Sequence, residues 1–184
     1  MLKKRDLHEV PVLFELMSHP EVFPYVRQKA TTSDEFYFIT KQTIEAEERG
    51  ELISRTILDE HYQPIGTINL FDIAEDYGFL ATWVGRPYFG KGYNGLAKTQ
   101  FFNELFNETY IQKILLKVRN TNARSLRAVQ KLSYVEKANL LYPVLYEQIN
   151  AESGYMYDLF VIHKESYLSY QQMTQLSHSQ VTAT

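Results

Sequence analysis

The 184-residue sequence contains no cysteine, so it offers no disulfide, no thiolate metal ligand and no cysteine nucleophile. An excess of basic charge is also missing: the formal net charge is −3, and no cluster of lysine and arginine indicates a nucleic-acid surface. No apolar run approaches the roughly 20 residues that span a membrane, and no signal peptide is recognisable. We therefore expect a cytoplasmic monomer or homodimer without nucleic-acid or membrane partners.

Aromatic and aliphatic residues are plentiful. Hydrophobic residues make up 45% of the chain, which includes 14 tyrosines and 11 phenylalanines, and this composition excludes disorder for most of it. From Ser166 onward the sequence becomes polar and rich in Ser, Gln and Thr. We predict a single domain at residues 1–165 and a polar C-terminal extension at residues 166–184, attached at first and loose at its end.

Hydrophobic periodicity predicts a mixed α/β (α+β) chain. The predicted helices are Asp6–Ser18, Thr32–Arg49, a segment that opens at Tyr93, and Asn122–Leu132. The predicted strands are Leu52–Leu58, Ile65–Phe71, Phe79–Val84, Ile111–Val118, a short Tyr134–Val135 and Tyr155–Ile162. Short polar connections between the first three strands predict an antiparallel meander.

The stretch from Val84 to Gly95 contains four glycines between a β-rich run and an amphipathic run. Such a strand–loop–helix junction binds phosphates, because glycine lets a ligand approach the main chain and the first amides of the helix lack partners. The sequence therefore predicts a phosphate site here.

A P-loop is the first interpretation of this stretch. The spacing of Gly85, Gly90 and Lys91 fits that motif, which requires Ser or Thr as its next residue to bind Mg²⁺. Gly92 occupies that position, and Pro87 removes one amide from the cradle. The chemistry of a metal–nucleotide site is therefore missing.

A dinucleotide fingerprint is the second interpretation, since Gly90, Gly92 and Gly95 have its spacing. That motif requires an acidic residue after the next strand, where it binds the ribose. The strand predicted at Ile111–Val118 is instead followed by Arg119-Asn120-Thr121-Asn122. A dinucleotide-dependent oxidoreductase is therefore a distant alternative.

Two motifs together resemble the GNAT family of N-acetyltransferases, and within it the RimJ/RimL-like branch that acetylates ribosomal-protein N-termini. Val84 to Tyr93 is similar to the acyl-CoA loop of that branch, where an aromatic residue often stands at the position of Phe89. Asn120 to Ser125, continuing to Lys131-Leu132-Ser133-Tyr134, looks like the Asn-x-x-Ser helix of the family and its Lys-Leu-Gly-Phe ending. The resemblance covers nearly the whole order of elements.

The resemblance implies a GNAT fold, with a mostly antiparallel central sheet that splays between strands four and five and helices on both faces. It implies acetyl-CoA as cosubstrate, without a metal, and a primary amine as acceptor: a protein N-terminus or a small molecule. The implied cofactor-binding residues are Trp83, Val84, Phe89, Gly90, Lys91, Gly92, Tyr93, Asn94, Gly95, Asn122 and Ser125. Main-chain groups near Trp83 and Val84 would polarise the thioester carbonyl.

The candidate catalytic residues are Asn122, Ser125 and Asp158. Many GNAT enzymes carry a tyrosine acid where this chain has Val129, so Ser125 is the candidate donor to the departing thiolate, by hydrogen bonding or by full proton transfer. The alternative interpretation of Ser125 is a helix residue whose hydroxyl bonds back to the preceding turn. The alternative interpretation of Asn122 is a helix N-cap. Asp158 is a candidate general base if its position in a strand raises its pKa. The alternative interpretation is an outward-facing strand residue. A water relay without a dedicated base is a further way to remove the proton of the amine.

Several positions depart from the branch pattern. It commonly has Glu where Leu96 stands and a small residue where Asn94 stands, and the first strand is truncated or missing. Leu96 and Val129 favour an alternative function, a CoA-binding module without turnover.

We expect the acceptor pocket to be built from the loop Phe23 to Lys29, the meander turn and the region Leu140 to Gly154. These segments contribute Phe23, Tyr25, Arg27, Tyr142 and Tyr146. The five histidines have no metal-ligand spacing.

Overall fold

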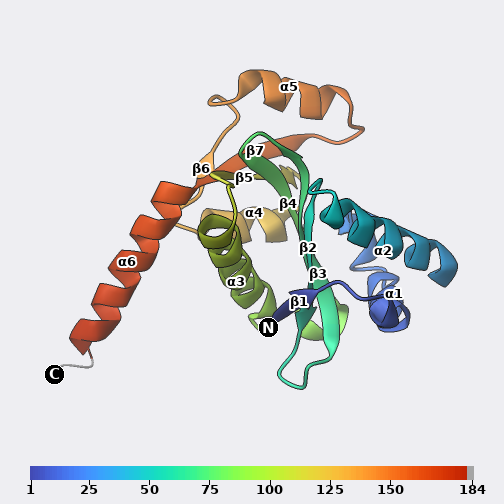
Figure 1. Cartoon of the computed structure of the whole chain (residues 1–184). Helices are drawn as coiled ribbons and strands as arrows, with labels where there is room; N and C mark the ends of the chain where they lie inside the picture. Colours follow the sequence, from blue (N-terminus) through green and yellow to red (C-terminus); the bar gives the residue numbers. More distant parts are fainter. Residues whose placement is uncertain (182–184) are drawn as a thin grey trace. The chain divides into compact units, whose positions relative to one another are not determined.

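Four antiparallel strands form the centre of the first of two units, Met1–Tyr110, in a computed structural model that describes residues 1–181 (Figure 1). The strands are β1 (Leu2–Lys4), β2 (Ile53–Leu58), β3 (Pro64–Ala74) and β4 (Tyr77–Val84), and they pair in chain order. One row across the sheet runs from Lys3 through Thr56 and Thr67 to Trp83. The predicted meander of β2, β3 and β4 is confirmed.

Strand β1 shows that the first strand is shortened but present. Its three residues pair with Arg55–Ile57 of β2, and the main-chain N–H of Leu58 donates to the carbonyl of Met1 at 2.8 Å. The ladder therefore extends one residue beyond the strand itself.

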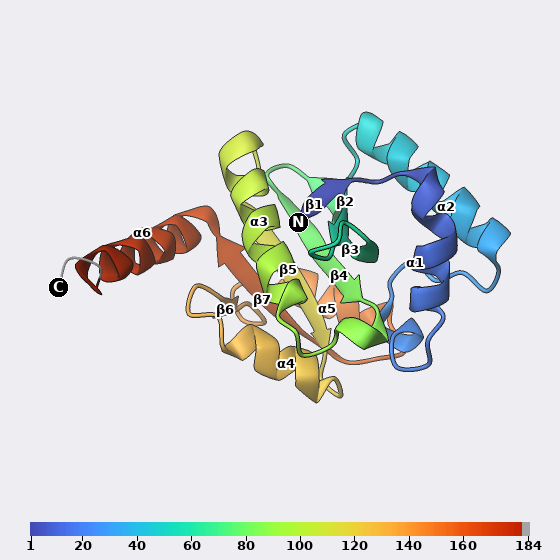
Figure 2. The same ribbon diagram turned by 90° about the horizontal axis from the view of Figure 1, so that it is seen from below.

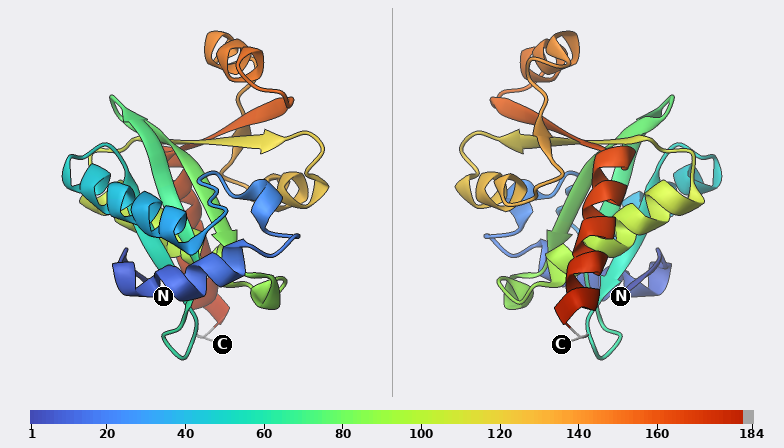
Figure 3. Two further views of the ribbon diagram at one scale, coloured as in Figure 1. Left: turned by 90° about the vertical axis from the view of Figure 1, so that its right-hand side faces the viewer. Right: turned by 90° about the vertical axis from the view of Figure 1, so that its left-hand side faces the viewer.

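Helices cover both faces of this sheet. Helices α1 (Val10–Met17) and α2 (Ser33–Glu48) lie on one face and α3 (Tyr93–Glu108) on the other (Figure 2); the two panels of Figure 3 view the sheet from these opposite sides. The largest fully buried side chains under α1 and α3 include Leu13, Met17, Phe101, Phe102 and Leu105. Short 3-10 turns stand at Leu7–Glu9, Phe23–Tyr25 and Arg86–Tyr88.

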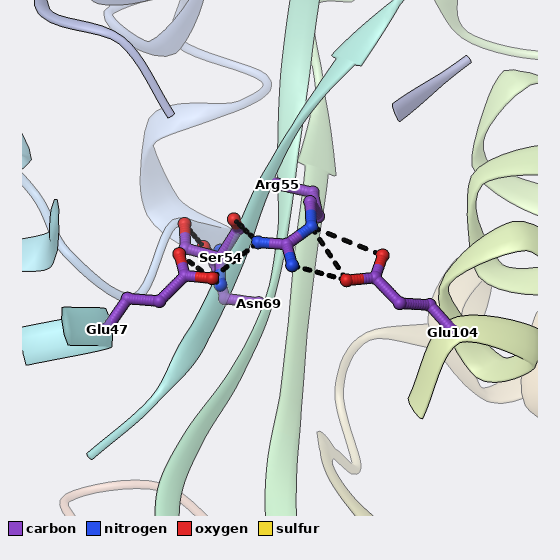
Figure 4. Close-up of polar contacts among 5 residues, drawn as sticks. All are labelled: Glu47, Ser54, Arg55, Asn69 and Glu104. Carbon is purple, nitrogen blue, oxygen red and sulfur yellow. Dashed lines mark hydrogen bonds and ion pairs between the residues drawn. The ribbon is translucent and has the colours of Figure 1, made fainter. Parts of the chain in front are cut away.

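Arg55 of β2 links α2 to α3 (Figure 4). The residue is only 9% exposed. One guanidinium nitrogen donates to Glu47 of α2 at 2.6 Å, while Nε donates to Glu104 of α3 at 2.9 Å. A buried arginine needs such partners, because an unpaired charge in the interior is strongly destabilising. The pair of carboxylates therefore fixes the two helices against one strand.

The second unit begins at Ile111, and its described residues, 111–181, contain three antiparallel strands. They are β5 (Lys113–Arg119), β6 (Glu136–Lys137) and β7 (Tyr157–His163), with β7 between the other two. Helix α4 (Ala123–Gln130) follows β5, α5 (Pro143–Ala151) lies in the connection from β6 to β7, and α6 (Lys164–Val181) continues directly from β7 (Figure 1).

Two asparagines extend the pairing of β7 beyond the two-residue β6. The Asn139 side chain accepts a hydrogen bond from the Leu159 N–H at 2.8 Å. The Asn150 amide accepts from the Tyr157 N–H at 2.7 Å and donates to the Tyr157 carbonyl at 3.2 Å. These side chains satisfy main-chain groups that a longer neighbouring strand would otherwise pair. The start of β7 is thus held in place by α5 and the segment after β6.

Two predictions for the second unit need correction. The short strand lies at Glu136–Lys137 instead of Tyr134–Val135, and the region Leu140 to Gly154, for which no helix was predicted, contains α5. The polar segment from Ser166 continues α6 as far as Val181 and is helical. Tyr167 anchors this helix: it is 1% exposed and packs edge-on against Tyr134 with ring centroids 5.1 Å apart. The loose end predicted at residues 182–184 lies outside the described residues.

Candidate active site

The glycine loop after β4 presents a run of unpaired main-chain amides. The N–H groups from Gly90 to Gly95 donate to no main-chain carbonyl within the described residues, and the first such bond runs from the Leu96 N–H to Gly92 at 3.1 Å. Gly92 is the N-cap of α3, and no side chain caps this helix end. Free amides at the positive end of a 16-residue helix can hold phosphate oxygens.

Two glycines give the loop its shape. The φ angle is +75° at Gly90 and +85° at Gly92, and an added Cβ at either position would meet nothing within 4 Å. These angles are strained for residues with a side chain. Space beside both residues is therefore open to a ligand, while the backbone conformation favours glycine.

The start of the loop is fixed by packing. The Gly85 N–H donates to Ile65 on β3 at 2.7 Å, and a Cβ on Gly85 would approach Leu16 of α1 to 2.7 Å. Phe89 and Trp83 both pack against the buried cluster formed by α1 and the segment before α2. The rings of these two predicted cofactor residues are therefore partly buried against the protein core, and each keeps an exposed part.

Tyr93 and Asn94 hold the first turn of α3. The Thr82 hydroxyl on β4 donates to the Asn94 side chain at 3.0 Å. The Tyr93 hydroxyl donates to Glu60 of the β2–β3 turn, and this bond raises the pKa of Tyr93 to about 12. Tyr93 also meets the Tyr88 ring edge-on at a centroid distance of 5.7 Å. The side chain of Asn94 is thus engaged with β4, on the helix that presents the free amides.

Lys91 and Leu96 are the outward-facing members of this region. Lys91 lies over the Tyr88 ring at 5.7 Å and is exposed, so its ammonium group can approach an anionic ligand. Leu96 is 64% exposed. An apolar side chain therefore faces solvent at the position where the family resemblance implied a glutamate.

The loops of the first unit that were predicted to bind the acceptor hold one paired cation. Arg27 forms an ion pair with Asp72 of β3 at 2.6 Å and lies over the Phe71 ring at 4.5 Å. Phe23 packs against the α1 cluster, whereas Tyr25 is 48% exposed. Of the second-unit candidates, Tyr142 precedes α5 and Tyr146 belongs to it, and both are half-buried.

In the second unit Asn122 and Ser125 are brought together at the start of α4. The Asn122 side chain accepts from the Ser125 N–H at 3.1 Å, so the N-cap interpretation of Asn122 is confirmed. The half-buried Ser125 hydroxyl makes no hydrogen bond to any described residue, so the bond back to the preceding turn is not formed. Val129, one turn later, is buried.

Asp158 makes no hydrogen bond to this pair. Its carboxylate accepts from Asn139 at 2.8 Å and from Lys137 at 3.0 Å. Burial alone would raise the pKa of Asp158, but the bonds from Asn139 and Lys137 outweigh it and lower the pKa. The expectation of a raised pKa is wrong, and a carboxylate held in its ionised form is a weaker base.

Sequence reasoning missed a second group in this unit, the pair Arg119 and Tyr157. They face each other across β5 and β7, and Arg119 Nε donates to the Tyr157 hydroxyl at 3.3 Å. The guanidinium also lies 3.9 Å from the centroid of the Tyr155 ring. Aromatic residues are common in strands, and only the register of the two strands reveals this pair.

Lys98 is a third missed feature. It is half-buried on α3, next to the fully buried helix residues Ala97 and Phe101. No described residue forms an ion pair with it, and burial lowers the pKa of Lys98 to about 8. The sequence signal for this feature was a lysine among the regularly spaced apolar residues of the predicted helix.

Residues 1–181 contain neither a group of side chains that could hold a metal ion nor a helix that could span a membrane. In that range no group of three acidic, histidine or cysteine side chains is arranged to hold a metal ion. No helix of the same range has the length and apolar character needed to cross a membrane.

Comparison with known proteins identifies the family. The Acetyltransferase (GNAT) domain matches residues 1–135, whereas no curated protein sequence matches the chain. Among solved structures, the Vibrio cholerae spermidine N-acetyltransferase in complex with CoA and spermine has a TM-score of 0.70 at 14% identity, covering 91% of this chain and 97% of that one.

Two other solved structures are similar over most of their length. The Salmonella typhimurium acetyl transferase that modifies the N-terminal serine of a 50S ribosomal subunit protein has a TM-score of 0.68 at 16% identity, with 88% of this chain and 91% of that chain covered. FdhC, a nucleotide-linked sugar GNAT, has a TM-score of 0.73 at 14% identity, with 95% and 92% covered. These similarities confirm the predicted mixed α/β fold class, and with the domain match they establish that the chain belongs to the GNAT acetyltransferase family.

Proposed function

We propose that this protein transfers the acetyl group of acetyl-CoA to a primary amine, by direct attack of the amine on the thioester. The observation that carries the proposal is the run of free amides from Gly90 to Gly95 at the uncapped start of α3. This arrangement suits a pyrophosphate, because amides and the helix dipole attract anions without a metal.

In this proposal the residues have separate roles. The amides from Gly90 to Gly95 hold the CoA pyrophosphate, with Lys91 adding positive charge. Main-chain groups near Trp83 and Val84 stabilise the oxyanion formed on attack, a contribution of about 2.7–4 kcal/mol where one such donor has been removed elsewhere. Asn122 shapes the start of α4, and the Ser125 hydroxyl donates a hydrogen bond to the sulfur.

A water relay, in preference to Asp158, removes the proton from the amine. The ion pair with Lys137 and the bond from Asn139 keep the Asp158 carboxylate ionised and make it a poor proton acceptor at neutral pH. The role of Asp158 is then to fix the segment after β6 against β7.

The acceptor class is a primary amine, on a small molecule or on a protein N-terminus. The similar structures include a spermidine acetyltransferase with bound spermine, an enzyme for an N-terminal serine, and a nucleotide-linked sugar GNAT. The acceptor panel should therefore contain spermidine, a peptide with N-terminal serine and a nucleotide-linked amino sugar.

The test is thiol release from acetyl-CoA in the presence of each amine, with mass spectrometry of the products. We expect amine-dependent release and one acetyl group on the reacting amine. Tight binding of acetyl-CoA with no thiol release for any acceptor, in the panel or in a cell extract, would instead favour a CoA-binding module without turnover. The exposed Leu96 and the buried Val129 suit that alternative function.

A further inference from the structure

Lys98 is a lysine on the apolar face of α3, in the first unit. Its side chain is half-buried, and the preceding residue, Ala97, is only 2% exposed. One turn further along the helix, Phe101 and Phe102 are fully buried. Because helix residues three and four positions apart are neighbours on one face, these two phenylalanines adjoin the hydrocarbon stem of Lys98.

The same helix face is directed toward β4. Asn94, one turn before Lys98, accepts a hydrogen bond from Thr82 of β4 at 3.0 Å, and residues four positions apart share a face. Strand β4 runs from Tyr77 to Val84 and contains no charged residue. Lys98 therefore lies on a helix face that packs toward a neutral strand.

The ammonium group of Lys98 has no counter-charge. No described residue forms an ion pair or a hydrogen bond with it. The residues three and four positions away on α3 are Asn94, Gly95, Phe101 and Phe102, so the helix supplies no carboxylate to it either. An ammonium group that is partly desolvated and unpaired loses its proton more readily than one in water.

Electrostatics supports this reading of the geometry. Burial lowers the pKa of Lys98 to about 8, and no neighbouring charge opposes that shift. Burial would likewise lower the pKa of Arg55, but its bonds to Glu104 and Glu47 outweigh burial and raise it. At pH 8 about half of the Lys98 side chains are then neutral amines, against about 0.3% for a lysine with the ordinary pKa.

We propose that Lys98 is a modification site that takes an acetyl group from an acyl thioester in solution. The neutral Nζ attacks the carbonyl carbon, a carbon–nitrogen bond forms, and the carbon–sulfur bond breaks with its electron pair remaining on sulfur. The proton that Nζ loses passes through water to the thiolate, so the products are an amide and a thiol. Turnover of an acceptor amine at the glycine loop is not required for this reaction.

The product has a physical consequence for α3. The amide carries no charge, so the cost of desolvating an unpaired ammonium group on this helix is removed. Acetylation at Lys98 thus replaces a charge that the helix face cannot pair with a neutral polar group.

The test exposes the full chain at pH 8 to trideuterated S-acetyl-N-acetylcysteamine, a thioester without a pyrophosphate, and measures initial labelling at each lysine by peptide mass spectrometry. Lys41 on the exposed side of α2 is the comparison within the same chain. Lys98 should be labelled roughly 10- to 100-fold faster than Lys41. Because the donor lacks the group that the glycine loop is proposed to hold, the result is independent of whether the proposed function holds.

Two controls tie the preference to the fold. In concentrated urea the burial of Lys98 is lost, so both lysines should react at similar rates. In the folded chain the rate at Lys98 should level off between about pH 8 and 9, where the amine becomes mostly neutral. Equal labelling of Lys98 and Lys41 in the folded chain, a preference that persists in urea, or a rate at Lys98 that keeps rising to about pH 10 would each overturn the proposal.

Discussion

Asn94 accepts a hydrogen bond from Thr82 at 3.0 Å, and this bond ties the first turn of α3 to β4. The Asn94 side chain is therefore bonded to the sheet from the same helix turn that presents the free amides. A larger residue at this position is compatible with an open cradle, because its polar group is engaged with the sheet.

Replacing Asn94 with Ala should loosen this turn. We expect acetyl-CoA binding, measured by calorimetry, to weaken roughly 2- to 10-fold, since a neutral hydrogen bond contributes about 0.5–1.5 kcal/mol. Asn107→Ala is the matched control, because Asn107 bonds only to Asn103 at the far end of the same helix. Equal affinities for both variants and wild type would show that the Thr82 bond has no part in cofactor binding.

Gly92→Val places a β-branched side chain at φ +85°, where the ligand is expected. Binding of acetyl-CoA should fall roughly 10- to 100-fold through lost amide contacts to the phosphates. Gly50→Val controls for backbone strain, because Gly50 has φ +75° and also has no atom within 4 Å of an added Cβ. Both variants should lose similar stability in thermal melts, about 1–2 kcal/mol, and only Gly92→Val should lose affinity; a similar loss in Gly50→Val would point to destabilisation instead.

Ser125→Ala removes a hydroxyl that makes no hydrogen bond to the described residues. Turnover should fall roughly 10- to 100-fold if that hydroxyl stabilises the developing thiolate, while the KM for acetyl-CoA stays within about 2-fold. Ser133→Ala, at an exposed serine of the same unit, is the control. Full activity in Ser125→Ala would leave Ser125 with a structural role only.

The structure explains which parts of this site sequence patterns can reveal. The phosphate loop was predictable because main-chain amides and glycine angles carry the chemistry, and both follow from residue type. The core packing of Phe89 and Trp83 was not, since an aromatic residue beside a loop is equally typical of ligand contact and of burial. The Arg119–Tyr157 pair depends on strand register, which no local pattern fixes.

The same limit applies to the fold. Strands β2, β3 and β4 and helix α3 follow clear periodicity, whereas α5 has no buried residue and therefore no amphipathic pattern to detect. Helix α6 is polar along most of its length, and Tyr167 is the only buried residue among residues 164–176, whose side chains are described. Elements that bury little apolar surface leave a weak signal in sequence.

Lys98→Met should stabilise the protein below about pH 8. Burial lowers the pKa of Lys98 from 10.5 to about 8, so the unfolded chain holds this proton more tightly and stability rises with pH between these two values. Below that window the full penalty applies, and after allowance for partial solvation its removal should add about 1–3 kcal/mol. Thermal melts at pH 7 and pH 10 check this, with Lys41→Met on the exposed side of α2 as control; an equal gain at both pH values would contradict it.

Asp158→Asn should leave turnover within about 2-fold, because a carboxylate with a lowered pKa is a poor base near neutral pH. Stability should fall by about 1 kcal/mol, since a charge-assisted bond between half-exposed groups is lost. The depressed pKa stabilises wild type above the ordinary carboxylate range, so this difference should vanish as pH falls through about 4 and below. A turnover rate lowered by roughly 100-fold or more, at unchanged stability, would instead make Asp158 the base.

The most direct test of the account is thiol release from acetyl-CoA by the full chain with the amine panel, read together with the mass of each acceptor. The account predicts release that depends on one class of primary amine, with a single acetyl group on its nitrogen and with strong loss in Gly92→Val. Tight acetyl-CoA binding without release for any amine would contradict it.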